Sequence, residues 1–240
     1  MHHETEIDFQ SIRAVVFDVD GTLYNQRKLR FIILRELLYY YSIRPHRLFE
    51  LKIIRDFRLQ REKNHFREVG DLDLEQYKWG AEASNVSVAR VKSVINRWIY
   101  EKPLRHLEDC IYEDVRLFFS ALAGQGIPRI IFSDYPAKDK LLYMGLEAEG
   151  VICATDPDIN RLKPNPRGLQ AIMERWRLKP EELLFIGDRD DRDGECARQA
   201  GVPYLLKTDK DVKWTHTFSA YRSLVNQLEV SSGSVGATSL

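Results

Sequence analysis

The chain has 240 residues, enough for one generous domain or for a core with an inserted subdomain. With 44% hydrophobic residues it can form a packed core, and a formal net charge of zero argues against a general nucleic-acid-binding or membrane-binding protein. Three scattered cysteines, a polar N-terminus and the lack of a long apolar stretch predict a soluble, cytoplasmic protein.

The predicted elements alternate between strands and helices along most of the chain. Apolar runs that are rich in β-branched or aromatic residues predict buried parallel strands at 14–17, 130–132, 151–154, 183–186 and 204–206. Helical patterns separate them, at 114–123, 136–144, 166–176 and 193–200. The alternation predicts an α/β fold, a Rossmann-like parallel sheet with helices on both of its faces.

Residues 24–109 interrupt this alternation. Amphipathic helices are expected at 31–39, 46–68 and 88–98, and no strand pattern is visible between them. We therefore expect a catalytic core, an inserted all-helical cap and a disordered tail. Their ranges are 1–23 with 110–230 for the core, 24–109 for the cap and 231–240 for the tail.

The charge of the chain is unevenly distributed. Residues 24–110 contain 18 Lys and Arg against 12 Asp and Glu, and the rest of the chain reverses this balance. The asymmetry fits a basic lid that attracts anions to an acidic, metal-binding core. It fits ordinary surface charge on two subdomains equally well.

Polar residues gather where the predicted strands end. They are Asp18 and Asp20 after the first strand, Ser133 and Asp134 after the second, Lys163 in a proline-stiffened loop, and the acids from Asp188 to Asp193 after the fourth. Because a parallel sheet binds ligands at the carboxyl ends of its strands, we expect these side chains to converge. Carboxylates, a hydroxyl and a lysine together describe a site for Mg²⁺ and a phosphoryl group.

In their order and spacing, these four motifs resemble those of the haloacid dehalogenase superfamily of hydrolases. The resemblance covers residues 10–23 and 110–215, and the position of the insertion is similar to the helical cap of the phosphoglycolate phosphatase-like subfamily. It implies that Asp18 attacks phosphorus and becomes an aspartyl phosphate. It also implies that Asp20 protonates the leaving group and then activates water. Both residues would ligate Mg²⁺, Asp20 through its backbone carbonyl.

The resemblance gives the middle motifs phosphate-binding roles. Ser133 would donate a hydrogen bond to a phosphate oxygen. Asp134 stands beside it at a position where the family often has Asn, which changes the hydrogen bonding of this loop. Lys163 would neutralise the phosphoryl oxygens and the charge of the nucleophile.

The last motif and the cap leave alternatives open. Asp188 would bind Mg²⁺ directly. The family spacing favours Asp193 as the second acid, which would act through water. Asp191 is the alternative, and Asp190 would lie in solvent. In the cap, three basic residues follow the first motif closely enough to line the cleft. They are Arg27, Lys28 and Arg30, which also fit a solvated helix start.

These implications favour a Mg²⁺-dependent phosphatase that acts on a small phosphomonoester. The carboxylate of Asp20 argues against dehalogenation, since a halide leaving group needs no proton and the family's dehalogenases lack an acid here. A phosphomutase that uses the same aspartyl phosphate is an alternative that the core motifs do not separate. A non-catalytic regulatory protein is less favoured, because no motif residue is missing. The motifs determine neither the physiological substrate nor the oligomeric state.

Overall fold

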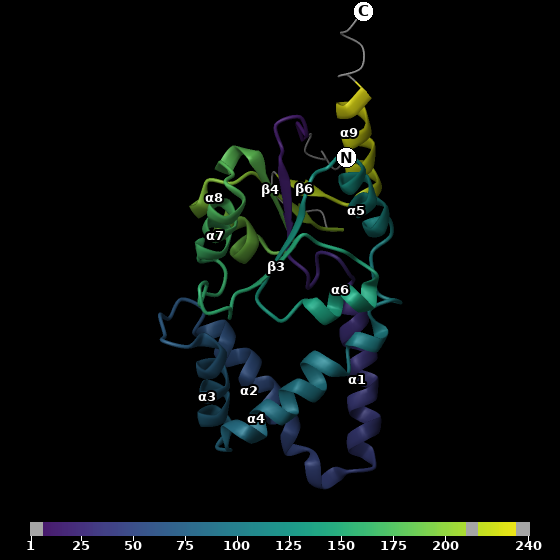
Figure 1. The fold of residues 1–240 in the computed structure, drawn as a ribbon. Helices are drawn as coiled ribbons and strands as arrows, with labels where there is room; N and C mark the ends of the chain where they lie inside the picture. The colour runs from purple at the N-terminus through teal and green to yellow at the C-terminus, as the bar shows by residue number, and fades with distance from the viewer. Residues whose placement is uncertain (1–6, 210–215, 234–240) are drawn as a thin grey trace, which may run out of the picture.

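A parallel sheet occupies the upper half of the molecule as drawn in Figure 1. The computed structural model describes residues 7–209 and 216–233. The strands in these ranges are β1 (Ala14–Phe17), β2 (Arg129–Ser133), β3 (Gly150–Cys153), β4 (Leu183–Gly187), β5 (Tyr204–Lys207) and β6 (Thr217–Phe218). They form one six-stranded sheet of order β3-β2-β1-β4-β5-β6, and all neighbours are parallel. The predicted fold class is confirmed.

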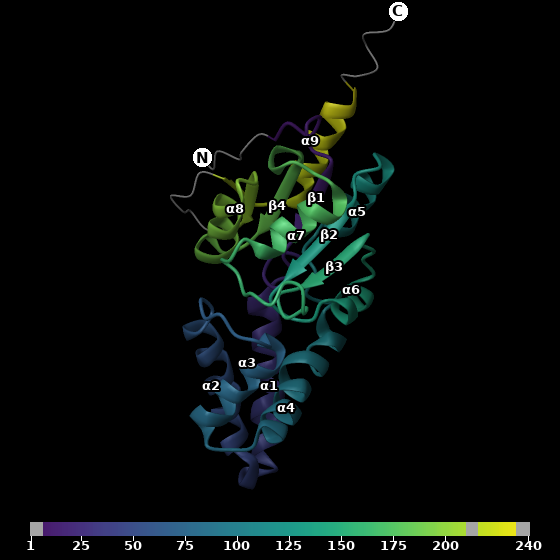
Figure 2. The ribbon, with the colours of Figure 1, turned by 60° about the vertical axis from the view of Figure 1, so that its left-hand side comes forward.

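Helices cover both faces of this sheet, because side chains alternate between the faces along each strand. The helices of the core are α5 (Val115–Gly124), α6 (Lys138–Met144), α7 (Arg167–Trp176), α8 (Glu195–Ala200) and α9 (Tyr221–Gly233). Val15 and Phe17 pack in a hydrophobic cluster with residues of α5, α6 and α9, whereas Ala14 and Val16 pack in a second cluster with residues of α7 and α8. Figures 1 and 2 show the two groups of helices on either side of the sheet.

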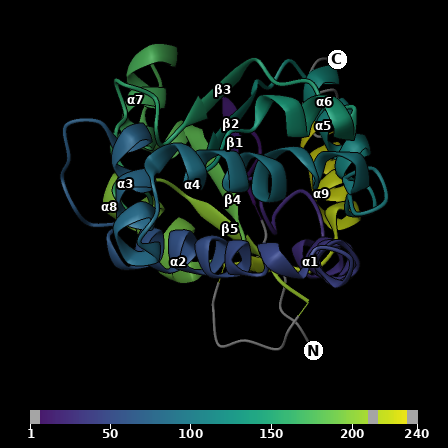
Figure 3. The same ribbon diagram turned by 90° about the horizontal axis from the view of Figure 1, so that it is seen from below.

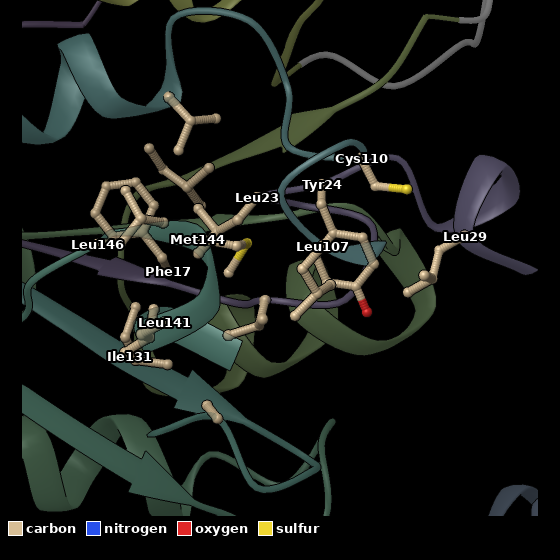
Figure 4. Packing of buried hydrophobic residues seen from close by; sticks show 14 of the residues in the cluster. Phe17, Leu23, Tyr24, Leu29, Leu107, Cys110, Ile131, Leu141, Met144 and Leu146 are labelled. Carbon is tan, nitrogen blue, oxygen red and sulfur yellow. The ribbon is translucent and has the colours of Figure 1, made fainter. Parts of the chain in front are cut away.

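The first hydrophobic cluster continues beyond the sheet. Figure 4 shows Phe17 and Leu141 on its left and Tyr24, Leu29 and Leu107 on its right, and all five belong to this cluster of buried residues. Its burial of apolar surface holds the segment after β1 against the segment that returns to the core. The turn that carries Asp18 and Asp20 is therefore flanked by buried apolar side chains of this cluster.

Every element that the structure describes between Gln26 and His106 is helical. The elements are α1 (Gln26–Ser42), η1 (Pro45–Arg47), α2 (Phe49–Lys63), α3 (Leu72–Ser84), α4 (Val88–Ile95), η2 (Asn96–Glu101) and η3 (Leu104–His106). Figure 3, a view from below, shows α1 to α4 in front of the sheet. None of the helices described in the chain is both long and apolar enough to cross a lipid bilayer. The division into a core and a cap stays a prediction.

Among the α-helices and strands of the described residues, the sequence patterns did not predict α3, β6 and α9. Helix α9 extends to Gly233, so it includes the beginning of the tail that we expected to be disordered; residues 234–240 lie outside the described part of the chain. The helix expected at 88–98 changes after Ile95 to the wider π form, which continues to Glu101. The helix expected at 46–68 ends at Lys63.

Candidate active site

The turn after β1 brings two distant acids together. Gly21 has a φ of 101°, a conformation that favours glycine, and a Cβ atom at this residue would lie 2.1 Å from Oδ2 of Asp188. Thr22 donates its hydroxyl hydrogen bond to Oδ2 of Asp18 at 3.1 Å. The glycine therefore lets the turn approach Asp188, while the threonine orients the carboxylate of Asp18.

Three acids form a cluster beside one lysine. One carboxylate oxygen from each of Asp18, Asp188 and Asp193 lies within 4.8 Å of the others. Lys163 donates hydrogen bonds from Nζ to Oδ1 of Asp18 at 2.5 Å and to Oδ1 of Asp193 at 2.6 Å. Asp18, Asp193 and Lys163 are buried. The strand ends thus bring together residues that the sequence placed in three separate motifs.

The charges in this cluster are not balanced. Burial raises the pKa of Asp18 to about 7, with Lys163 opposing and Asp193 and Asp20 adding to the shift. Burial and the charges of Asp18 and Asp193 raise the pKa of Asp188 to about 8, although Lys163 opposes this shift. Burial would lower the pKa of Lys163, but Asp18 and Asp193 hold it well above its usual value. One lysine therefore does not neutralise three acids, and the cluster could hold a divalent metal ion through its oxygen atoms.

The two candidates for the second acid differ in their surroundings. Asp193 accepts backbone N–H groups of Asp188 and Arg189 on its Oδ2 atom, at 3.1 and 3.0 Å. Asp191 points to solvent and pairs with the side chain of Arg189 at 2.7 Å. Asp190 pairs with Arg198. Of the three, only Asp193 lies in the cluster with Asp18.

Asp20 has partners that the sequence patterns did not reveal. The side chains of Tyr24 and Lys140 both donate short hydrogen bonds to Oδ1 of Asp20. Burial alone would raise the pKa of Asp20, but Lys140, Tyr24 and Lys163 outweigh it and hold that pKa below its usual value. Lys140 belongs to α6, where a lysine in an amphipathic pattern is ordinarily a surface residue. Nothing in the sequence signalled that Lys140 pairs with Asp20.

The segment after β2 is connected to the lysine loop. Ser133 is buried, and its Oγ atom accepts the backbone N–H of Tyr135 at 3.3 Å. Asp134 accepts the backbone N–H of Lys163 on Oδ1 at 3.1 Å, and its carbonyl accepts a hydrogen bond from Arg61 at 2.8 Å. Asp134 therefore positions the loop that carries Lys163. Arg61 was not among the predicted site residues.

A cavity of about 470 Å³ lies over these groups, between the helices α1 and α2 and the sheet. Arg30, Arg58 and Arg61 line it from the helices, and apolar residues such as Ile33 and Trp98 line the rest of the helical side. Of the three basic residues predicted to line the cleft, only Arg30 does so.

The other two basic residues lie elsewhere. Arg27 and Lys28 are exposed outside the cavity, and Lys28 donates to the carbonyl oxygen of Asp109. The physical reason is helical periodicity, since Arg27 and Lys28 lie on the outward side of α1, away from buried Leu29 and Ile33. Our prediction for Arg27 and Lys28 therefore differs from the structure.

Ion pairs join the helices to the last acidic motif. Glu62 of α2 contacts Arg189 at 2.7 Å and Arg192 at 3.1 Å. Arg192 also donates from Nη1 to the carbonyl oxygen of Lys163 at 2.6 Å. The side chain of Asn160 makes a further connection, accepting the N–H of Leu72 at 2.7 Å. A movement of α2 would therefore shift Arg192 and, through it, the loop that carries Lys163.

Comparison with known proteins identifies the family. A family model for haloacid dehalogenase-like hydrolases matches residues 12–201. Glyceraldehyde 3-phosphate phosphatase of Methanopyrus kandleri is 30% identical in an alignment 206 residues long, which covers 80% of this chain and 82% of that protein. Solved structures of lower sequence identity also share the fold, and two of them are similar over most of the chain.

The first is a 2-haloacid dehalogenase of Pseudomonas syringae pv. Tomato DC3000, with a TM-score of 0.64 and 17% identity, covering 91% of this chain and 99% of that one. The second is a phosphatase of the same superfamily from Thermococcus onnurineus, with a TM-score of 0.61 and 19% identity, covering 90% of this chain and 98% of that one. These similarities agree with the arrangement of the acidic motifs at the strand ends. The chain belongs to the haloacid dehalogenase-like hydrolase family, and it is an enzyme.

Proposed function

We propose that this enzyme is a Mg²⁺-dependent phosphatase that hydrolyses a small phosphomonoester through an aspartyl phosphate on Asp18. The observation that carries the proposal is the cluster of Asp18, Asp188 and Asp193 around Lys163, with Asp20 nearby. Three carboxylates with one lysine suit a hard divalent cation and a phosphoryl group. The phosphatase named among the relatives supports a phosphate ester as the substrate.

Mg²⁺ would be held by the carboxylates of Asp18 and Asp188, with the backbone carbonyl of Asp20 as a third ligand. When bound, it would supply positive charge to the phosphoryl oxygens. The Oδ1 atom of Asp193 already accepts from Lys163, and its Oδ2 atom accepts two backbone N–H groups. Asp193 therefore suits an indirect role, in which it orients Lys163 and reaches the cation through water.

The reaction would proceed in two displacements at phosphorus. A carboxylate oxygen of Asp18 forms a bond to phosphorus while the ester oxygen leaves, taking a proton from Asp20. Water then attacks the aspartyl phosphate, gives its proton to Asp20 and releases inorganic phosphate. Lys163 and the hydroxyl of Ser133 would hold the phosphoryl oxygens in both steps.

Lys140 and Tyr24 would position Asp20 for these proton transfers. Both donate to the same oxygen, Oδ1, which would leave the other carboxylate oxygen of Asp20 for the reacting groups in the cavity that this residue lines. The lowered pKa of Asp20 favours its ionised form, which is the form that accepts a proton from water. The cytoplasmic location, the cap and its subfamily stay predictions beside this proposal.

The decisive experiment replaces the nucleophile by its amide. We expect Asp18→Asn to abolish Mg²⁺-dependent release of phosphate from p-nitrophenyl phosphate while circular dichroism shows that the fold survives. Asp191→Asn is the matched control, because this exposed acid lies outside the cluster and should leave turnover unchanged. Full activity of Asp18→Asn would overturn the proposal.

Two alternatives have distinct outcomes in related assays. Accumulation of a bisphosphorylated sugar from a sugar monophosphate, in place of free phosphate, would indicate a mutase that uses the same aspartyl phosphate. Failure to form an adduct with Mg²⁺ and beryllium fluoride would indicate a non-catalytic regulatory protein. A purified protein that releases phosphate and forms this adduct supports the phosphatase.

A further inference from the structure

Two arginines of the cavity have no protein partner. Arg30 of α1 and Arg58 of α2 both line the cavity and are exposed to its solvent. Within the described residues, neither makes a hydrogen bond, an ion pair or a contact with an aromatic ring. Each guanidinium carries five N–H donors in a planar arrangement that matches a carboxylate or a phosphate.

The other arginines that line this cavity are occupied. Arg61 donates to Gln76 and to the carbonyl oxygen of Asp134, and Arg189 and Arg192 pair with Glu62. The same holds for arginines elsewhere on α2 and α4, where Arg55 pairs with Asp56 and Arg90 pairs with Glu50. Among the arginines that line the cavity, only Arg30 and Arg58 therefore lack a protein partner within the described residues.

Arg30 and Arg58 also lie near each other. Partial desolvation in the cavity lowers the pKa of Arg58, and the positive charge of Arg30 lowers it further, whereas Tyr135, Asp20 and Tyr24 oppose this shift. Arg30 likewise opposes the raised pKa of Tyr24. Two like charges in one cavity repel each other, and an anion between them would remove this repulsion. The position has both the charge and the donors to receive one.

Their neighbours place this pair on the leaving-group side of the site. The transferred phosphoryl group belongs with Asp18, Lys163 and Ser133 in the function proposed above, and Asp20 faces the ester oxygen that leaves. Arg30 and Arg58 come from the helices across the cavity, close to Asp20 and Tyr24. An anion held by them would therefore be part of the leaving group and not the phosphoryl group.

We propose that Arg30 and Arg58 form a subsite for a second anionic group, a carboxylate or a phosphate, on the leaving group of the substrate. The inference rests on the proposed phosphatase activity and specifies its substrate class. It predicts that a phosphate ester with a second anionic group is a better substrate than an analogue of similar size with a neutral group at that position. Glyceraldehyde 3-phosphate, which gives the Methanopyrus relative its name, lacks such a charge.

The test compares substrates that differ only in the second group. D-3-phosphoglycerate and sn-glycerol 1-phosphate have the same configuration and carry a carboxylate and a hydroxymethyl group at the same position. The bisphosphate of 1,3-propanediol against its monophosphate tests a phosphate. We expect kcat/KM to be higher for the member that carries the second anionic group in at least one pair, by on the order of 10- to 100-fold, because a charge-assisted bidentate contact contributes strongly. The pair with the larger ratio distinguishes a carboxylate from a phosphate.

Variants then connect this ratio to the two arginines. Arg58→Gln and Arg30→Gln should each bring the ratio of kcat/KM close to one, whereas Arg55→Gln, on the same helix but outside the cavity, should keep it. The inference is overturned if wild-type enzyme shows no preference. It is also overturned if Arg58→Gln lowers kcat/KM equally for both substrates, which would assign the arginine to the transferred phosphoryl group.

Binding measurements keep this test separate from the phosphatase proposal. If wild-type protein releases phosphate neither from p-nitrophenyl phosphate nor from these esters, the proposed function fails, and calorimetric titration of the same esters still decides the subsite. Tighter binding of D-3-phosphoglycerate than of sn-glycerol 1-phosphate, lost in Arg58→Gln, supports the subsite. Equal binding of the two compounds overturns it.

Discussion

Lys140 donates a hydrogen bond to Oδ1 of Asp20 although 120 residues separate them in the chain. Both side chains are largely withdrawn from solvent, and Tyr24 donates to the same oxygen. In this environment the ammonium group of Lys140 favours the ionised form of Asp20, since burial alone would raise the pKa of Asp20. The proposed general acid and base is thus controlled by a residue of α6 outside the family motifs.

Replacing Lys140 should move the pH profile of the enzyme. In Lys140→Met the pKa of Asp20 rises, because burial is no longer outweighed by this charge. With p-nitrophenyl phosphate the leaving group needs no proton, so Asp20 serves chiefly as the base that activates water. We expect the acidic limb of kcat against pH to shift to higher pH, with kcat at neutral pH reduced on the order of 10- to 100-fold.

The control for this variant is Lys138→Met, which removes an exposed lysine from the same helix. Its pH profile should match that of the wild-type enzyme. An unchanged acidic limb in Lys140→Met would show that Lys140 does not set the protonation of Asp20.

Gly21→Ala should destroy the acid cluster. The added Cβ would lie 2.1 Å from Oδ2 and 2.7 Å from Cγ of Asp188, so this carboxylate must leave its position. We expect a loss of activity of at least about 100-fold, comparable to removal of an electrostatic catalytic group, and loss of stabilisation by Mg²⁺. Initial rates and thermal unfolding with and without MgCl₂ measure the two effects.

Gly126→Ala is the control that distinguishes the steric clash of Gly21→Ala with Asp188 from the effect of a positive φ alone. Gly126 also has a positive φ, of 70°, but a Cβ there would meet no atom within 4 Å. This variant should be destabilised by about 1 kcal/mol and keep its activity. Equal activity of the two variants would contradict the arrangement of Gly21 and Asp188.

The strand-end motifs were predictable because local sequence determines them. An apolar run of four or five residues followed by Asp, Ser or Gly identifies a buried strand and its polar end, and parallel pairing brings such ends to one edge. Asp18, Lys163, Asp188 and Asp193 meet there as expected. The choice between Asp191 and Asp193 needed the structure, because the turn after β4 determines which acid points inward.

The missed features depend on contacts between distant segments. Lys140 and Arg61 are indistinguishable from surface residues until α6 and α2 are placed beside the sheet. Helix α3 was missed because its buried side includes Gln76 and Gly80, which weaken the apolar pattern. A Cβ at Gly80 would lie only 3.3 Å from Val91, so the glycine serves helix packing that periodicity does not register.

Stabilisation by Mg²⁺ should increase with pH. Without metal, Asp18 and Asp188 have pKa values of about 7 and about 8, above the ordinary value of an aspartate. Between the ordinary value and these values the folded protein binds more protons than the unfolded chain, so metal-free stability falls as pH rises through this window. Mg²⁺ displaces these protons, and its effect is therefore larger where they are already lost.

Thermal unfolding at about pH 6 and about pH 9, with and without saturating MgCl₂, measures this linkage. We expect the gain in Tm from Mg²⁺ to be larger at the higher pH. Asp188→Asn should lose most of the gain, and Asp191→Asn should retain it. A gain that is the same at both pH values would contradict the raised pKa values.

The contact of Glu62 with Arg189 and Arg192 should matter for turnover more than for stability. Glu62 is about half exposed, so its ion pairs contribute at most about 1 kcal/mol to folding. Arg192, however, also donates to the carbonyl oxygen of Lys163, so the contact connects α2 to the lysine beside Asp18. We expect Glu62→Gln to lower kcat/KM several-fold, with a small change in Tm.

The dependence on salt identifies the cause of this effect. Exposed ion pairs are screened at high ionic strength, so added salt should lower kcat/KM of the wild-type enzyme more than that of Glu62→Gln. Glu75→Gln is the matched control, because it breaks the pair with Lys78 on α3 without contacting the acid cluster. If both variants respond to salt like the wild-type enzyme, the ion pairs of Glu62 do not couple α2 to the site.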